Sequence, residues 1–244
     1  MEYISNGMNK RTLLIVSGCC LMCMFAIFSY GIRHGGFQHI DFAFTVKLQE
    51  AIDKSPRLRL SRMVGEVMEG STFFASPEVS AFAVLCLTFL SFFSLRFIDI
   101  SKWGTWKSLM KAGIIPLLFL LLVLAEIYGK TVVHHPAPPF FMIKNPTTVF
   151  PKYYINDQFS YPSGHAARAV FIAIVFSYFI LHTSYLKKKY IWVGGLAVLG
   201  IYVFFVSVSR IYLGHHWLSD IIGGLALGGG MASIACAFFF RTDS

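Results

Sequence analysis

The chain has 244 residues, of which 56% are hydrophobic and only 14% are charged. Soluble domains are about 25% charged, so this composition excludes an ordinary soluble protein and indicates a multi-pass membrane protein. The formal net charge of +9 could suggest nucleic acid as a partner. Basic residues beside apolar segments are explained more simply by membrane topology and anionic headgroups, so we expect membrane lipids and no nucleic acid as partners.

Six apolar runs approach the length that crosses a bilayer. We therefore predict an all-α integral membrane protein, a six-transmembrane-helix bundle, with residues 1–244 in a single domain. The first run follows Lys10 and Arg11 and could imitate a signal peptide, but its length favours a retained helix. The six runs are 13–32, 79–95, 112–128, 166–181, 190–207 and 221–240.

An even number of spans places both termini on one side of the membrane. Basic residues are denser in the segments on the side of the termini, and Lys187, Lys188 and Lys189 are the strongest marker. Because cytoplasmic loops carry excess Lys and Arg, we predict cytoplasmic termini in a cytoplasmic (inner) membrane. The second, fourth and sixth spans then begin at the outer, periplasmic or extracellular, face.

The first outer segment, residues 33–78, is the longest connection. Asp41 is a candidate cap for a helix that runs to about Asp53, and apolar residues recur within it at a spacing of four. We expect an amphipathic outer-face helix that lies on the membrane or covers the site. A loop packed on the bundle without lipid contact is the alternative.

The outer segment 130–160 is rich in proline and aromatic residues, which predicts an ordered but non-helical loop. Glu126 lies four residues before Lys130, the spacing of a helical ion pair.

Metal ligation is not indicated. All five cysteines lie in apolar runs, and Cys20 and Cys23 have no second pair of ligands nearby. His215 and His216 are adjacent, whereas two histidines that bind a metal from one helix are usually four residues apart. We therefore expect no metal and no cofactor.

Two polar stretches interrupt the apolar pattern. The stretch 209–220 contains Arg210, His216 and Asp220 between two apolar runs, and the stretch 162–165 reads Pro-Ser-Gly-His at the start of another. Polar groups beside hydrocarbon are costly, so they are candidates for function. We expect the two stretches to meet at one membrane face and to form a phosphate-handling site.

Phosphoryl transfer needs a nucleophile, an acid for the leaving oxygen and fixed positive charge. His216 can attack through one ring nitrogen if the other faces a carboxylate, and Asp220 lies four residues further on. His165 is a suitable general acid because imidazole titrates near neutrality.

The same stretches offer groups for an anion. Ser163 and the Gly164 amide precede a helix, Arg210 presents a planar guanidinium, and Lys130 supplies a point charge. Each has a structural alternative: helix capping for the serine and for Asp220, and interfacial anchoring for the arginine. Because all these polar groups fall at the same end of adjacent spans, we favour the phosphate site over the structural alternatives.

These residues resemble the type 2 phosphatidic acid phosphatase (PAP2) superfamily, which also contains vanadium haloperoxidases. The resemblance covers about residues 40–235, and two of three signature parts are intact, in 162–165 and 209–220. It implies a metal-independent phosphatase with three catalytic residues and four phosphate-binding residues. The catalytic residues would be the nucleophile His216, its partner Asp220 and the acid His165. The phosphate-binding residues would be Lys130, Ser163, Gly164 and Arg210.

The first signature part is incomplete, because Ala137 stands where the family has an arginine, before Pro138. One guanidinium is therefore missing. His134 or His135 could substitute weakly, Arg168 could reach back into the pocket, or the protein could be impaired. The alternative for Arg168 is a buried ion pair with Glu126.

The resemblance implies a membrane lipid phosphatase acting through a phosphohistidine intermediate at the outer face. Expected substrates are phosphatidylglycerol phosphate, phosphatidic acid, undecaprenyl pyrophosphate or a lipid A phosphate. The alternatives are a lipid phosphotransferase that uses the same site and a weakly active lipid-binding protein. A haloperoxidase is disfavoured by the hydrophobic composition, and a transporter by the position of the polar groups away from the membrane midplane.

Overall fold

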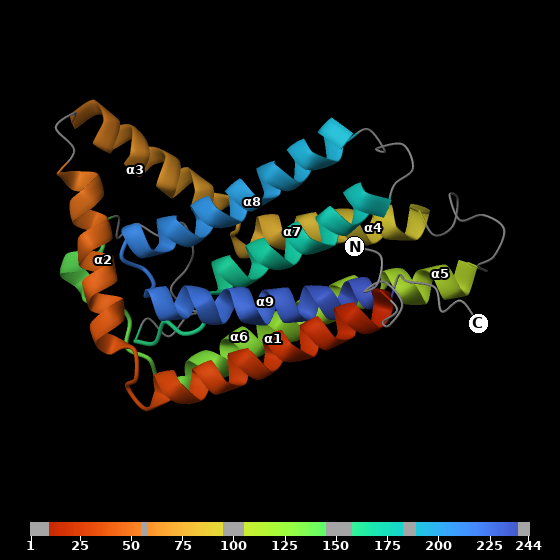
Figure 1. Ribbon diagram of the computed structural model, residues 1–244, viewed down its shortest axis with the longest axis horizontal. Coiled ribbons are helices and arrows are strands. Elements are labelled where there is room, and N and C mark those ends of the chain that lie inside the picture. The colour runs from red at the N-terminus through yellow and green to blue at the C-terminus, as the bar shows by residue number, and fades with distance from the viewer. Residues whose placement is uncertain (1–9, 55–57, 95–104, 145–157, 183–188, 239–244) are drawn as a thin grey trace, which may run out of the picture.

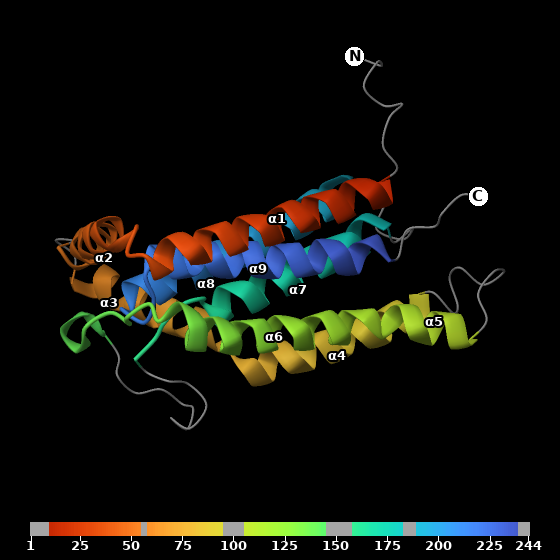
Figure 2. The same ribbon diagram turned by 90° about the horizontal axis from the view of Figure 1, so that it is seen from below.

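A computed structural model describes residues 10–54, 58–94, 105–144, 158–182 and 189–238. Within these ranges the chain is helical apart from short connections and one isolated β-bridge. The long helices run side by side along the longest dimension of the molecule (Figures 1 and 2). The helices are α1 (Lys10–Arg33), α2 (Gln38–Asp53), α3 (Leu58–Phe73), α4 (Pro77–Phe93), α5 (Thr105–Ala112), α6 (Ile114–Val133), α7 (Gly164–His182), α8 (Lys189–Tyr212) and α9 (Leu218–Ala237).

The described helices confirm an all-helical membrane architecture. Five stretches are long and apolar enough to cross a membrane: α1, α5 with α6, α7, α8 and α9. A sixth arises only if α3 and α4, which are bent by 54° at a short break, count as one broken span. The predicted count of six spans therefore remains a prediction.

Helix α9 is the centre of the bundle. In its apolar window 78% of the residues are buried, against 6% for α1. Small residues allow this, because they let helix backbones approach closely. At Gly228, for example, a Cβ atom would overlap the Ala167 carbonyl of α7. The packed position of α9 fixes its first turn, where Asp220 lies.

The described part of segment 33–78 contains two helices, α2 and α3, before α4 begins at Pro77. Helix α2 ends at Asp53 as predicted, but it begins at Gln38, and Phe37 caps it without a side-chain hydrogen bond. The expectation that Asp41 caps α2 is therefore wrong: this carboxylate points into the bundle and is 2% exposed. Helix α3 was not predicted.

Helix α2 packs across one end of the bundle, where α9 begins (Figure 1). Gln49 donates hydrogen bonds to the carbonyls of Met142 (2.8 Å) and Tyr212 (2.9 Å), which joins α2 to two neighbouring segments. Phe42 and Phe44 remain exposed on the same helix. The helix thus combines contact with the bundle and an exposed apolar surface, although its contact with lipid remains a prediction.

In the described part of the proline-rich segment 130–160, residues 130–133 still belong to α6, and the remainder is non-helical except for one short 3₁₀ helix, Phe140–Met142. Residues 145–157 of this predicted loop lie outside the described residues. An isolated antiparallel bridge joins Pro136 to Phe159. This bridge places residue 135 beside the start of α9.

Candidate active site

The predicted site residues gather at the end of the bundle that α2 covers. Lys130 lies in the last turn of α6, Gly164 begins α7, Arg210 lies in the last turn of α8, and Asp220 lies in the first turn of α9. Helices α6 and α8 end, and α7 and α9 begin, at this end of the molecule (Figures 1 and 2). The antiparallel arrangement therefore unites stretches that lie far apart in the sequence.

His216 and Asp220 face one another as the spacing predicts. The distance from His216 Nδ1 to Asp220 Oδ2 is 3.4 Å, within ion-pair range but without the geometry of a hydrogen bond. Both residues are buried, with His216 6% exposed. The turn before α9 is held by Arg210, whose carbonyl accepts the backbone N–H groups of His215 and His216 at 3.0 and 3.1 Å. Nδ1 is thus directed toward Asp220, which leaves Nε2 as the ring nitrogen for chemistry.

The pKa of His216 is lowered below the ordinary value of 6.5, chiefly because burial disfavours the charged ring. The positive charge of Arg210 acts in the same direction, and Asp220 opposes it. His216 is consequently a neutral imidazole at neutral pH, which is the form that can act as a nucleophile.

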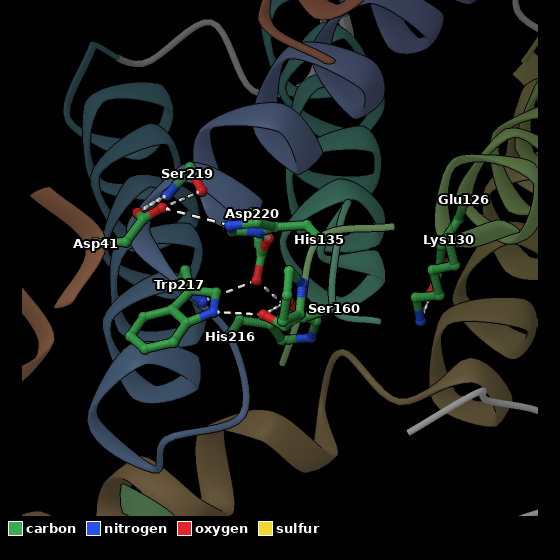
Figure 3. A network of polar contacts seen from close by, with 10 residues as sticks. Asp41, Glu126, Lys130, His135, Ser160, His216, Trp217, Ser219 and Asp220 are labelled. Carbon is green, nitrogen blue, oxygen red and sulfur yellow. Dashed lines mark hydrogen bonds and ion pairs between the residues drawn. The ribbon is translucent and has the colours of Figure 1, made fainter. Parts of the chain in front are cut away.

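Asp220 has two further partners: His135, which the sequence did not indicate, and the backbone of Trp217, which agrees with the capping role given as its alternative. His135 Nδ1 lies 2.9 Å from Oδ1, and the backbone N–H of Trp217 donates to Oδ2 over 2.8 Å (Figure 3). The latter contact is one half of a capping box, with the acidic residue at the third helical position. Asp220 therefore both caps α9 and faces His216.

Asp41 of α2 lies next to this group. Its carboxylate accepts hydrogen bonds from the backbone N–H of Ser219 (2.8 Å) and from the Ser219 hydroxyl (2.7 Å). Burial raises the pKa of Asp41 above its usual value. The contact joins α2 to the first turn of α9 (Figure 3).

The anion-binding candidates Ser163 and Arg210 contact the backbone of the His216–Asp220 segment. The backbone N–H of Ser163 donates to the Asp220 carbonyl over 3.0 Å, so the Pro-Ser-Gly-His stretch is attached to α9. Among the described residues, Ser163 Oγ and Arg210 Nε are buried without a hydrogen-bond partner. Unpartnered buried donors are rare and call for an explanation. A phosphate would accept from both.

His165 completes the cluster. Arg210, Arg168, His216 and Lys130 all lie within electrostatic range of its ring. Arg168 Nη2 lies 3.5 Å from His165 Nδ1. The structure thus brings together all eight residues that the sequence assigned to the site.

Glu126 binds two of the expected phosphate ligands. Lys130 Nζ donates to Oε1 over 3.1 Å, and Arg168 Nη1 donates to Oε2 over 2.6 Å. Arg168 Nε also donates to the Ala75 carbonyl over 3.2 Å. The pair of Glu126 with Lys130 agrees with its helical spacing, and Arg168 forms the ion pair that was its alternative role. Its contact with phosphate remains a prediction.

Glu126 leaves no space for a side chain at Gly164 of the Pro-Ser-Gly-His stretch. A Cβ atom at position 164 would overlap the Glu126 carboxylate. Glu126 of α6 therefore lies directly against the first residue of α7, beside the amide that the sequence assigned to phosphate.

The histidines near Ala137 do not take the place of the missing arginine in this structure. His135 faces Asp220, and His134 is exposed in a left-handed conformation with its ring 4.8 Å from that of Phe159. The backbone N–H of Ala137 donates to Gln158 over 3.1 Å. The cationic groups described near His165 are thus Lys130, Arg168 and Arg210.

A membrane bundle with two histidines, an aspartate and cations at one end has the parts of a phosphoryl-transfer enzyme. Residues 112–243, more than half of the chain, match the PAP2 superfamily, and the chain belongs to this superfamily.

Two curated relatives match over shorter stretches. The chain is 40% identical over 78 residues to phosphatidylglycerophosphatase B of Bacillus subtilis, which is 30% of this chain and 36% of the relative. It is 38% identical over 89 residues to an undecaprenyl-diphosphatase of Sulfolobus acidocaldarius, 36% of each chain. The matched stretches therefore span about a third of either relative.

A solved structure supports the fold over nearly the full length. The crystal structure of a transmembrane PAP2-type phosphatidylglycerolphosphate phosphatase from Bacillus subtilis matches with a TM-score of 0.62. The match covers 90% of this chain and 94% of that chain, at 21% identity. At this identity the likeness shows the shared fold.

Proposed function

We propose that the protein is a membrane lipid phosphatase that hydrolyses a lipid phosphomonoester or pyrophosphate. The observation that carries the proposal is the buried His216, which faces Asp220 at the same end of the bundle as the unpartnered donors of Ser163 and Arg210. The names of the two curated relatives support phosphatidylglycerol phosphate and undecaprenyl pyrophosphate as substrates. Phosphatidic acid and a lipid A phosphate are further members of the same chemical class.

The reaction proceeds in two displacements. His216 Nε2 forms a bond to phosphorus while the bond from phosphorus to the leaving oxygen breaks, and His165 donates a proton to that oxygen. Asp220 stabilises the positive charge that develops on the His216 ring. Water, deprotonated by His165, then breaks the phosphorus–nitrogen bond and releases phosphate. Lys130, Ser163, Gly164 and Arg210 stabilise the charge on the equatorial oxygens, with Arg168 as a weaker candidate.

No step of this scheme uses a metal ion. Phosphate release from the four lipid phosphates should therefore continue in EDTA for the purified protein in detergent. His216→Ala should abolish release, whereas the matched neighbour variant His215→Ala should retain it. Loss of activity in EDTA would contradict the metal-independent scheme. Equal rates for wild type and His216→Ala would overturn the assignment of the nucleophile.

The proposal includes a topology, with both termini in the cytoplasm and the site at the outer face of the membrane. It is supported by the antiparallel helices and by the basic residues of the sequence. A reporter that is active only in the cytoplasm, fused after residue 244, should be active. An inactive reporter on a protein that retains its phosphatase activity would place the site on the opposite face.

A further inference from the structure

His135 occupies a buried position between two carboxylates. Its ring is 4% exposed, with Nδ1 2.9 Å from Asp220 Oδ1 and Nε2 3.8 Å from Asp41 Oδ2. A carboxylate can only accept, so Nδ1 carries the proton that is donated to Asp220. His135 is therefore a direct neighbour of the proposed nucleophile pair.

The backbone around His135 is fixed from two directions. Its carbonyl accepts the Ser160 N–H over 3.0 Å, and the next carbonyl, of Pro136, accepts the Trp217 indole N–H over 2.7 Å. Trp217 also donates its backbone N–H to Asp220. The segment that carries the imidazole and the turn that carries the aspartate are thus joined at several points (Figure 3).

The hydrogen bonds of Asp220 show what His135 contributes. Oδ2 accepts from the Trp217 N–H and also faces His216, whereas His135 is the partner described for Oδ1. Without the imidazole, Oδ1 would be a buried acceptor with no donor, and the carboxylate could rotate away from His216. Residues that orient the ligands of a catalytic metal typically change activity by about 10–100-fold, and we expect an effect of similar size for a residue that orients Asp220.

We propose that His135 is a positioning residue, which holds the Asp220 carboxylate toward His216 and links it to Asp41 of α2. The proposal rests on the proposed function, since it concerns the orientation of the nucleophile. His135 lies two positions before Ala137, where the superfamily signature has an arginine.

Two substitutions of His135 distinguish a role in orienting Asp220 from a role in filling space. An asparagine amide can place a donor where Nδ1 lies, whereas leucine fills the space without a donor. His135→Leu should lower kcat about 10–100-fold with KM within about threefold of wild type. His135→Asn should restore kcat to within about threefold. The matched control is His134→Asn, at the exposed neighbour, which should leave kcat and KM unchanged.

His135 lies farther from Asp41 (3.8 Å) than from Asp220 (2.9 Å), so substitution of Asp41 should have a smaller effect. In Asp41→Asn the carboxamide oxygen can still accept from Ser219. We expect kcat to fall about threefold, less than in His135→Leu, because at 3.8 Å Asp41 forms no hydrogen bond to the imidazole.

A second measurement does not depend on activity. The ¹⁵N shifts of labelled histidines report which ring nitrogen of His216 carries the proton. Wild type and His135→Asn should show the Nδ1–H tautomer, which faces Asp220, and His135→Leu should show a mixture. Unchanged shifts in His135→Leu would overturn the proposal even if no lipid phosphate is hydrolysed.

The outcomes distinguish the two proposals. An inactive wild type refutes the proposed function, and the ¹⁵N shifts then decide the role of His135. If wild type is active and His216→Ala is not, a wild-type kcat for His135→Leu overturns only the role of His135. Equal losses of kcat and of thermal stability in both His135 variants would show a structural role instead.

Discussion

Two buried carboxylates of the site, Asp220 and Glu126, have opposite surroundings. Asp220 is held by a histidine and a backbone N–H and faces a second histidine. Glu126 is held by a lysine and an arginine, Lys130 and Arg168. Figure 3 shows the Glu126–Lys130 pair apart from the network around Asp220.

The difference separates two tasks in one site. In the proposed mechanism, Asp220 orients the His216 imidazole and stabilises the charge that appears there only during the reaction. Glu126 forms ion pairs with Lys130 and Arg168 before any substrate binds. These pairs reduce the cost of burying two cationic side chains among helices that also carry Arg210. Substitutions on the Asp220 side should therefore change mainly kcat, whereas those on the Glu126 side should change mainly stability and KM.

Asp220→Asn should give the largest effect. The amide preserves the shape of the side chain but removes the charge that stabilises an imidazolium at His216. We expect kcat to fall about 10⁴-fold, as when the corresponding charge is removed from a Ser-His-Asp triad. Initial rates of phosphate release measure it. A fall in the thermal unfolding midpoint should accompany the loss, because the single amide oxygen cannot accept from both His135 and the Trp217 N–H. A fall of less than tenfold would contradict the role of Asp220.

Glu126→Ala should act on stability. It leaves Arg168 and Lys130 buried without their acceptor, and breaking a buried pair in this way costs about 3–5 kcal/mol. Thermal unfolding in detergent measures the loss. The double variant Glu126→Ala with Arg168→Met should recover part of it, because one unpaired charge is then removed. No recovery would show that the ion pair is not the source of the stability.

Ala137→Arg should give the smallest effect. It restores the guanidinium that the signature of the superfamily contains. Removing one such donor costs about 10²–10³-fold in related sites, but the neighbours of Ala137 are not arranged to support an arginine. We therefore expect kcat/KM to rise by about tenfold or less. A rise in Ala137→Arg that is larger when combined with Arg168→Ala would indicate that Arg168 already compensates for the missing residue.

The sequence was sufficient to predict the helical membrane bundle, since apolar length alone specifies a span. It also predicted the meeting of Ser163–His165 with Arg210–Asp220, because alternate helices begin and end at the same face. Helix α3 was missed because it is polar overall and contains Gly65 and Gly70, residues that disfavour a helix. The start of α2 was misplaced because Asp41 has the character of a cap in sequence, whereas its true partner, Ser219, lies far along the chain.

The contacts of His135 could not be predicted for the same reason. Its only local signal is its position two residues before Ala137, which suggested a phosphate ligand. The bridge between Pro136 and Phe159 turns the histidine toward α9 instead. Long-range pairings of this kind depend on the packing of helices and leave no periodic trace in the sequence.

The contact between Glu126 and Gly164 has an evolutionary consequence. The signature glycine is required here by a side chain of another helix, because a Cβ atom at position 164 would overlap the Glu126 carboxylate. The two positions are therefore expected to vary together. A lineage that replaced Glu126 with a small residue could accept alanine at position 164, while one that kept the acid could not.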